Sequence, residues 1–220
     1  MSGEAIYLYG LGGETQKGSA VREAAASMGI AVHDIRAEAL GGTVGALIDP
    51  PSVLDLCTIS APSVGALYAS ARAASAVAGS EAGRIDALAE FMLMDGFAEQ
   101  RMDDFLAALR ERGASVGCKC SVTPTNRAWS VGTLMRQVAE EHAVMTAYMA
   151  LVRDYRHADA VRSAVQAAGA PTSATDAAWM ELADAISLAK SLLSSGEQRP
   201  VSTYRDASVR LGRACAPFEE

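Results

Sequence analysis

The sequence predicts an α/β protein in which two β-α-β-α units share one four-stranded sheet, followed by an all-α extension. An apolar run, a glycine, a helical pattern, a second short strand and a Val-Gly-x-Leu element follow one another twice, over residues 5–48 and 90–145. Residues 49–89 form an insertion between these repeats. Beyond residue 145 the apolar residues keep helical spacing only, which predicts a helical extension over residues 146–220.

The first repeat begins with a strand over residues 5–9, a short apolar run that glycines end. Residues 14–28 carry apolar side chains at i, i+3, i+4 and i+7, which predicts a helix. Gly29 stands where a left-handed C-cap belongs. A strand over residues 31–35 and a short helix over residues 43–48 complete the repeat, and two prolines end that helix.

The insertion contains an Ala-rich stretch, residues 66–77, which favours a helix. The second repeat then begins with a strand over residues 90–94. Residues 98–112 form a helix whose acids come early and bases late, as the helix dipole favours. Gly113 ends this helix, and residues 116–122 form the fourth strand.

A long helix follows, with Ser130 as its predicted N-cap. Its apolar positions recur about every 3.5 residues, and such a narrow stripe predicts packing against another helix. The extension is predicted as an antiparallel helical hairpin, with helices after Ser173 and around residues 204–214 and a turn over 196–200. The stripe consists of Val131, Leu134, Met135, Val138, His142, Met145, Met149 and Val152.

The composition limits the classes of function. The chain has 220 residues, half of them apolar, which is enough for a full core. A net charge of -7 argues against nucleic acid or an anionic membrane as the main partner. The N-terminus has no basic region and no stretch approaches the roughly 18 apolar residues of a membrane span, so we predict a cytoplasmic protein. In that reducing compartment the four cysteines are predicted to be thiols: Cys57, Cys118, Cys120 and Cys215.

The loop with Gly10, Gly12 and Gly13 is one candidate ligand site. It lies between a predicted strand and a predicted helix, where backbone amides can bind a phosphate. The dinucleotide pattern is incomplete because Thr15 occupies its third glycine position, and the order of Lys17 and the glycine after it does not fit a P-loop. The alternative is a flexible turn without a ligand.

The loop over residues 123–129 is the other candidate. Open α/β sheets bind ligands at such strand-to-helix loops, and here Thr123, Thr125, Asn126 and Arg127 supply two hydroxyls, an amide and a guanidinium. The alternative is a rigid turn stabilised by local hydrogen bonds. In that interpretation the structural residues are Pro124, which fixes φ, Trp129, which plugs the core, and the turn glycines Gly96 and Gly113.

Neither a metal site nor a catalytic site is predicted. Cys118 and Cys120 are two residues apart on a predicted strand and share a face. A metal would need two further ligands, and His142 lies on the apolar stripe, so we interpret it as a packing residue. His33, His142 and His157 lack the Ser, Cys or carboxylate neighbours of a catalytic triad. We therefore predict no cofactor and no catalytic residue.

The stretch over residues 118–129, with Leu134 and with Glu140-Glu141-His142, resembles a bacterial family of domains of unknown function, number 3783. The turn over residues 94–97 is also similar to that family, and the resemblance extends over residues 5–142. It implies the fold and no particular activity. Cys120 stands where the family usually has Ala, so we interpret it as a small buried apolar residue.

These observations lead to two functional hypotheses. The first is a non-catalytic cytoplasmic binding or regulatory module that contacts another protein, or itself as a homodimer, through the helical extension. The second is a small-ligand module for a phosphate compound or nucleotide, or a weak enzyme, that uses the two strand-to-helix loops. Convergence of the Gly10 and Thr123 loops on one cleft would favour the second.

Overall fold

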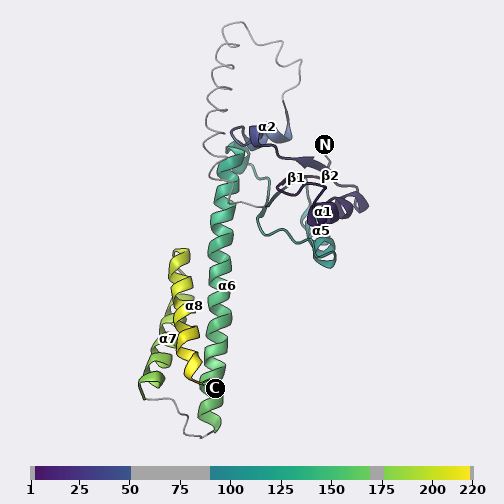
Figure 1. The fold of residues 1–220 in the computed structure, drawn as a ribbon. Helices are drawn as coiled ribbons and strands as arrows, with labels where there is room; N and C mark the ends of the chain where they lie inside the picture. Colours follow the sequence, from purple (N-terminus) through teal and green to yellow (C-terminus); the bar gives the residue numbers. More distant parts are fainter. Residues whose placement is uncertain (1–2, 51–89, 169–175, 219–220) are drawn as a thin grey trace, which may run out of the picture. The chain divides into compact units, whose positions relative to one another are not determined.

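The computed structural model describes residues 3–50, 90–168 and 176–218 (Figure 1). The chain divides between Ala139 and Glu140 into two compact units, which we call the α/β unit and the helical unit. The helix predicted over residues 66–77 lies outside the described residues.

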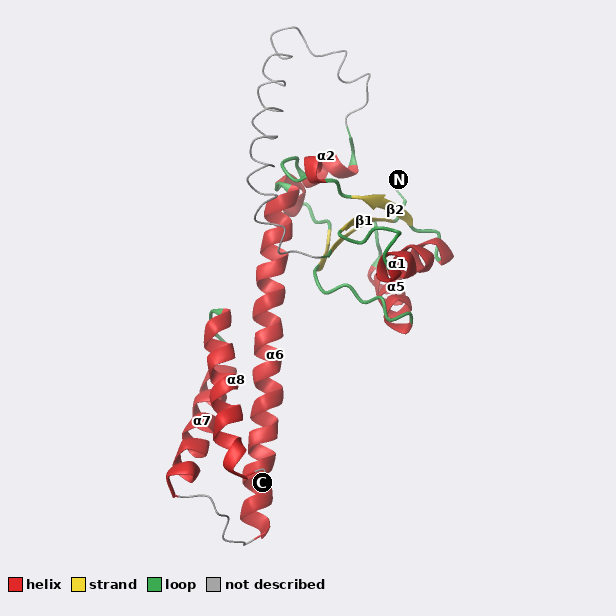
Figure 2. Ribbon diagram, viewed as in Figure 1, coloured by secondary structure: helices red, strands yellow, loops and turns green. Residues whose placement is uncertain are grey.

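Local sequence signals place the elements of the α/β unit correctly (Figure 2). Thr15 caps the first helix, and Gly29 and Gly113 adopt positive φ after the helices that they follow. The fourth strand is shorter than the predicted 116–122. The elements are β1 (Ala5–Tyr9), α1 (Gln16–Ser27), β2 (Ala31–Asp34), a 3-10 turn (Ala37–Ala39), α2 (Val44–Ile48), β3 (Phe91–Asp95), α5 (Glu99–Glu111), β4 (Lys119–Ser121), a second 3-10 turn (Asn126–Ala128) and the start of α6 (Val131–Ala168).

The strands form one mixed four-stranded sheet in the order β2-β1-β3-β4. β1 runs parallel to β2 and β3 runs parallel to β4, but the two central strands are antiparallel. Their register is symmetric about one pair, Tyr7 opposite Leu93, with Ala5 opposite Asp95 and Tyr9 opposite Phe91. Paired residues of the two central strands, such as Tyr7 and Leu93, therefore point to the same face of the sheet.

Helices cover both faces of this sheet. Successive residues of a strand point to opposite faces. Ile6 and Leu8 of β1, with Met92 and Met94 of β3, pack under α1 and α5, which lie side by side (Figure 1). On the other face, Tyr7 and Leu93 pack with the start of α2 and the first turns of α6. That second core includes Ala5, Tyr7, Phe91, Leu93, Val44, Val131, Leu134 and Met135.

Two ion pairs connect residues 3–48 and residues 90–145 crosswise. Lys17 of α1 pairs with Glu90, the residue before β3, and Arg101 of α5 pairs with Glu4, the residue before β1. The Arg101 Nε lies 2.9 Å from the Glu4 carboxylate. Arg101 also donates to the Met28 carbonyl oxygen at the end of α1. Helices α1 and α5 are thus each paired with the residue before the central strand of the other segment.

A short antiparallel bridge joins the caps of α2 and α6. Thr43 and Ser130 face each other in this bridge, and each hydroxyl accepts a hydrogen bond from an amide of its own helix. The bridge itself is reciprocal, since each repeat donates one amide and accepts with one carbonyl. Its hydrogen bonds run from Val44 N to Trp129 O and from Val131 N to Gly42 O, both 2.9 Å long.

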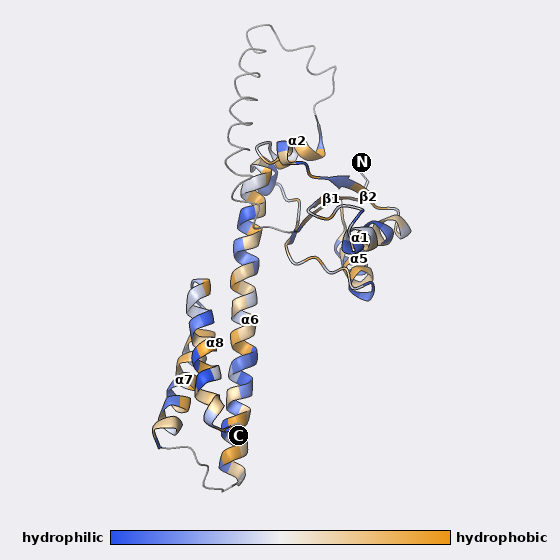
Figure 3. Ribbon diagram, in the orientation of Figure 1, coloured by the Kyte–Doolittle hydropathy of each residue, from blue (hydrophilic) through white to orange (hydrophobic). Residues whose placement is uncertain are grey.

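The helical unit contains the rest of α6 with α7 (Asp176–Ser194) and α8 (Val201–Cys215). The predicted helical hairpin is confirmed, and α7 and α8 pack side by side (Figure 1). Apolar side chains from α6, α7 and α8 form one core, with Leu151, Leu182 and Leu211 at its centre. Figure 3 shows that hydrophobic residues occur along the whole of α6.

The predicted apolar stripe of α6 is wrong beyond Val138. Met145 and Met149 are 59% and 56% exposed, and His142 is exposed as well. The buried positions are Ala147, Leu151 and Ala158, which lie on the opposite face of the helix. The prediction gave weight to large methionines, whereas the helices pack closely through alanines. His142 is therefore not a core residue.

Candidate functional site

In the glycine loop after β1, two carbonyl oxygens and the Thr15 hydroxyl form hydrogen bonds with nearby residues. The Thr15 hydroxyl caps α1 by accepting from Gly18 N at 2.9 Å, and donates to Gly12 O at 2.9 Å. Arg22 donates to the Leu11 carbonyl oxygen at 3.1 Å. The cap gives one amide of α1 a hydrogen-bond partner. The side chains of Thr15 and Arg22 do the same for two carbonyl oxygens of the loop.

The same loop folds back closely on the first turn of α1. A Cβ atom at Gly18 would lie 2.0 Å from the Gly12 carbonyl oxygen and 2.7 Å from that of Leu11. Gly10 starts the loop with φ 68°, and Gly13 lies beside the Arg22 side chain. The loop backbone therefore lies directly against the first turn of α1.

The loop after β4 is organised by one buried amide side chain. Asn126 is only 9% exposed. Its Oδ1 accepts from Thr123 N at 2.8 Å, and its Nδ2 donates to Ser121 O at 3.0 Å. The Thr123 hydroxyl accepts from Asn126 N at 3.1 Å. This reciprocal pair is the local side-chain-to-backbone bonding of a rigid turn.

Thr123 and Thr125 are exposed in this loop, and Arg127 is partly exposed. Arg127 forms an ion pair with Asp49, and both side chains remain partly exposed, at 41% and 62%. Gly45 lies against Arg127, since a Cβ there would lie 3.2 Å from the Arg127 carbonyl oxygen. The sequence did not indicate Asp49 as the partner, because 78 residues separate it from Arg127 in the chain.

A tyrosine lies near this ion pair. Burial raises the pKa of the Tyr7 phenol above its ordinary value, the Asp95 and Asp49 carboxylates raise it further, and Arg127 lowers it. The Tyr7 ring stacks on His33, with ring centroids 5.0 Å apart. The phenol therefore stays protonated at neutral pH and is a hydrogen-bond donor rather than a base.

The two candidate loops do not converge. Gly10 follows the C-terminal end of β1, and Thr123 follows that of β4. Because β4 is parallel to β3 and β3 is antiparallel to β1, the two loops lie at opposite ends of the strands of the sheet. The arrangement that would have favoured a shared ligand cleft is absent between these two described loops.

Some of the predictions for structural residues are confirmed, and one is wrong. Gly96 and Gly113 are confirmed as turn glycines, with φ of 77° and 65°. Trp129 does not plug the core, since its side chain is 38% exposed. Its main chain instead bonds to α2, and Val131, two residues later, is buried in the core. Pro124 is exposed at the surface of the loop.

Three of the four cysteines lie in the part of the chain that the structure describes. Burial raises the pKa of the Cys118 thiol, with Lys119 opposing the shift. Cys120 is half-buried against the core rather than fully buried, whereas Cys215 is buried. Within the described ranges, no three His, Cys, Asp or Glu residues group as metal ligands. Cys57 lies outside those ranges.

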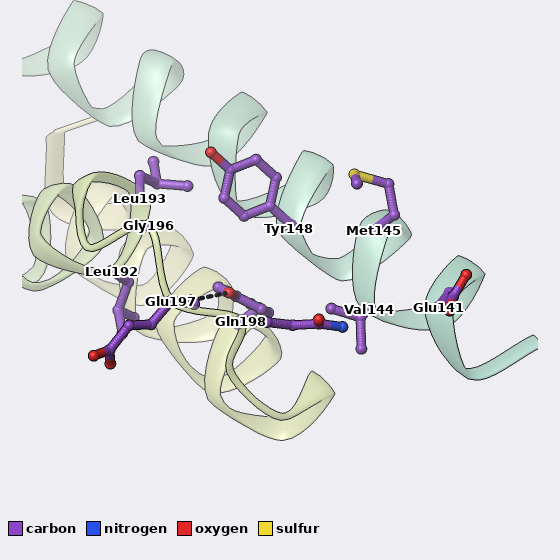
Figure 4. A pocket seen from close by; sticks show the side chains of 10 residues that line it. Glu141, Val144, Met145, Tyr148, Leu192, Leu193, Gly196, Glu197 and Gln198 are labelled. Atoms are coloured by element: carbon purple, nitrogen blue, oxygen red, sulfur yellow. Dashed lines mark hydrogen bonds between the residues drawn. The ribbon is translucent and has the colours of Figure 1, made fainter. Parts of the chain in front are cut away.

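The helical unit carries an apolar groove that the sequence did not indicate (Figure 4). It has a volume of about 450 Å³ and lies between α6 and the turn that joins α7 to α8. Tyr148 and Tyr204 meet edge to face there, with ring centroids 5.6 Å apart. The lining residues are Glu141, Val144, Met145, Tyr148, Leu192, Leu193, Gly196, Glu197, Gln198 and Tyr204.

A second, shallower hollow lies next to this groove along α6. Its volume is about 380 Å³, and Met145 lines both hollows. Met149 and Arg153 belong to the second one. We call the two hollows together the α6 surface. A sequence signal for it existed in the predicted stripe, which was assigned to the core instead.

Fold and surfaces together define a mixed α/β unit followed by a helical unit with an exposed apolar surface. Residues 90–145 match the family described as Domain of unknown function (DUF3783). The resemblance is therefore confirmed for the second repeat, which spans β3, α5, β4 and the start of α6, whereas the first repeat lies outside the match. Neither a curated protein nor a solved structure matches the chain. No described helix has the length and hydropathy needed to cross a bilayer.

Proposed function

We propose that this protein is a non-catalytic cytoplasmic binding or regulatory module that acts through protein-protein contacts of its helical unit. The partner is another protein or a second copy of the chain. The observation that carries the proposal is the α6 surface, which exposes two methionines beside an apolar groove.

Methionine side chains suit such a surface. They are flexible and polarisable, and protein-binding surfaces use them to adapt to a partner. Met145 and Met149 are more than half exposed on one helix face, whereas Leu151 on the opposite face is fully buried. α6 therefore stabilises the unit with one face and leaves the other for a partner.

The α/β unit serves as a scaffold in this proposal. The Thr15 hydroxyl bonds to Gly12 and Gly18, and the Asn126 side chain bonds within its own loop. Its two candidate loops lie at opposite ends of the strands of the sheet. These features support a structural role for the loops.

We further propose that the α/β unit arose by internal duplication. Three features support this: the symmetric register about Tyr7 and Leu93, the crossed ion pairs, and the reciprocal bridge at Thr43 and Ser130. In each of them, an interaction made by one repeat is matched by the same kind of interaction made by the other.

The double substitution Met145→Glu/Met149→Glu tests the main proposal. We expect it to abolish partner capture or self-association, because two carboxylates would have to be desolvated in the contact. Quantitative co-purification and analytical ultracentrifugation of the full chain measure this. Met180→Glu is the matched control, since Met180 is 68% exposed on α7 outside both hollows and its substitution should have no effect. A monomeric wild-type protein that captures no partner would contradict the proposal.

The second candidate, a small-ligand module, is supported by the exposed Thr125 and the partly exposed Arg127. A phosphate compound bound there should add about 2.7 kcal/mol to the free energy of unfolding at a ligand concentration 100 times Kd. The melting temperature should therefore rise. Thermal-shift measurements with nucleotides and sugar phosphates check this, with Arg127→Gln as the variant that loses the response. Absence of any shift in the wild type argues against the candidate.

A further inference from the structure

Three side chains that can ligate a metal line one hollow of α6. The second hollow of the α6 surface has a volume of about 380 Å³. One imidazole and two thioethers meet this space. Figure 4 shows that the Met145 side chain points away from that of Val144, which lines only the groove beside Tyr148. The lining residues are His142, Met145, Thr146, Met149, Ala150 and Arg153.

The helix brings these donors together in two adjacent pairs. Residues three or four positions apart on an α-helix are neighbours, with Cβ atoms about 5–6 Å apart. His142 lies three positions before Met145, and Met149 lies four positions after it, all within α6. Met145 therefore has one donor a turn before it and another a turn after it. Long side chains on a helix usually lean toward its N-terminus, which directs Met149 toward Met145.

All three donors are accessible from solvent. His142 is exposed, and Met145 and Met149 are 59% and 56% exposed. In contrast, Met92 and Met135 are fully buried in the α/β unit. The methionine side chain is unbranched and has three rotatable bonds. The two thioethers can therefore turn toward an ion without any movement of the backbone.

The donor set determines the class of ion. Thioether sulfur is a soft ligand that favours copper(I), whereas Mg²⁺ and Ca²⁺ take oxygen ligands. The lining of this hollow includes neither Asp nor Glu. Arg153, one turn beyond Met149, forms an ion pair with Asp154 at 3.0 Å. Neutral donors near a guanidinium suit an ion of low charge better than a divalent one.

We propose that His142, Met145 and Met149 bind a soft monovalent metal ion, copper(I), with Met145 as the central ligand. The inference goes beyond the proposed function, because it adds a ligand to the surface that would contact a partner. A bound ion would engage both methionines of that surface. Copper(I) and the partner should therefore compete for it.

Met180 provides an internal comparison. It is 68% exposed on α7, so it is at least as accessible as Met145. The positions one turn before and after it offer no second soft donor. They are Asp176, Ala177, Ala183 and Asp184.

Silver(I) is the probe for this inference, since it shares the ligand preference of copper(I) and keeps its oxidation state. Thiols bind the same ion, so the titration uses the full chain with all four cysteines replaced by alanine. Two-dimensional NMR of ¹³C-labelled methionine methyl groups observes each methionine separately. We expect silver(I) to shift the Met145 and Met149 methyl signals and the His142 ring signals. The Met180 methyl signal should not shift, and Mg²⁺ should shift none of them.

The substitution Met145→Leu in the same background should weaken silver(I) binding on the order of 100-fold, because donors on one scaffold gain about that factor over a single donor. Leucine keeps the approximate volume and the helix propensity of methionine and removes only the sulfur. Met180→Leu is the matched control and should bind silver(I) like its parent. Circular dichroism checks that all variants keep the helices. Undiminished binding by Met145→Leu, or equal shifts at Met145 and Met180, would overturn the inference.

The variant Met145→Leu/Met149→Leu separates the metal site from the proposed function. It removes both sulfurs but keeps the surface apolar, so silver(I) binding should be lost while partner capture persists. If silver(I) does not bind the parent protein but Met145→Glu/Met149→Glu abolishes partner capture, the metal site is wrong and the proposed function stands. If silver(I) binds as expected and no partner is captured, the proposed function is wrong and the metal site stands.

Discussion

The substitution Gly18→Ala should destabilise the α/β unit by about 3 kcal/mol, at the upper end of what overpacking usually costs. The new methyl group would lie 2.0 Å from Gly12 O and 2.7 Å from Leu11 O, and both are backbone atoms that cannot rotate away. Either the glycine loop or the first turn of α1 has to move. Because Thr15 caps α1 and bonds to Gly12, the movement would also break that cap.

Amide hydrogen exchange in β1 measures this loss separately from the stability of the helical unit. Gly212→Ala is the matched control. Gly212 lies within α8 and has open space around its Cα. The same change there should stabilise the helical unit by about 0.5–1 kcal/mol, because Ala is the better helix former. A Gly18→Ala protein as stable as the wild type would show that the loop does not fold back on α1.

Replacement of Asn126 by Ala should cost about 2–3 kcal/mol. The change removes both side-chain hydrogen bonds and leaves Thr123 N and Ser121 O without their partners. A buried polar group that loses its partner costs roughly 1–3 kcal/mol. The effect should appear as faster exchange of the β4 amides and a lower melting temperature of the α/β unit.

Thr125→Ala is the control for this prediction. Thr125 is an exposed neighbour whose side chain forms no cap hydrogen bond. Its substitution should change stability by less than about 0.5 kcal/mol. If Asn126→Ala changed stability as little as this control, the Asn126 side chain would not stabilise the turn. The ligand interpretation of Asn126 would then gain support.

The sequence predicts most elements of this protein because their signals are local. Thr15 and Ser130 cap helices through atoms three residues away, and Gly29 and Gly113 end helices where only glycine is relaxed. Alternation along β1 and β3 likewise depends on backbone geometry alone. The order of the elements in both segments is therefore predictable from the sequence.

The candidate site was predictable only in part. Thr123 and Asn126 were identified together, since their mutual bonding is local. The pairing of Arg127 with Asp49 was not, because 78 residues separate them in the chain. The outward position of Trp129 was missed for a similar reason, since its main chain bonds to α2 of the other repeat.

The sequence by itself determined the order of the elements, their caps and their turn glycines, because hydrogen bonds between near neighbours fix them. The tertiary structure decided two further points. Pairing of β1 with β3 sets the direction of the central strands and separates the two loops. Packing against α7 and α8 selects the Ala147 face of α6 and exposes Met145 and Met149. Both depend on contacts between segments that are distant in the chain. In α6, close packing of small side chains outweighs the hydrophobicity of the larger methionines.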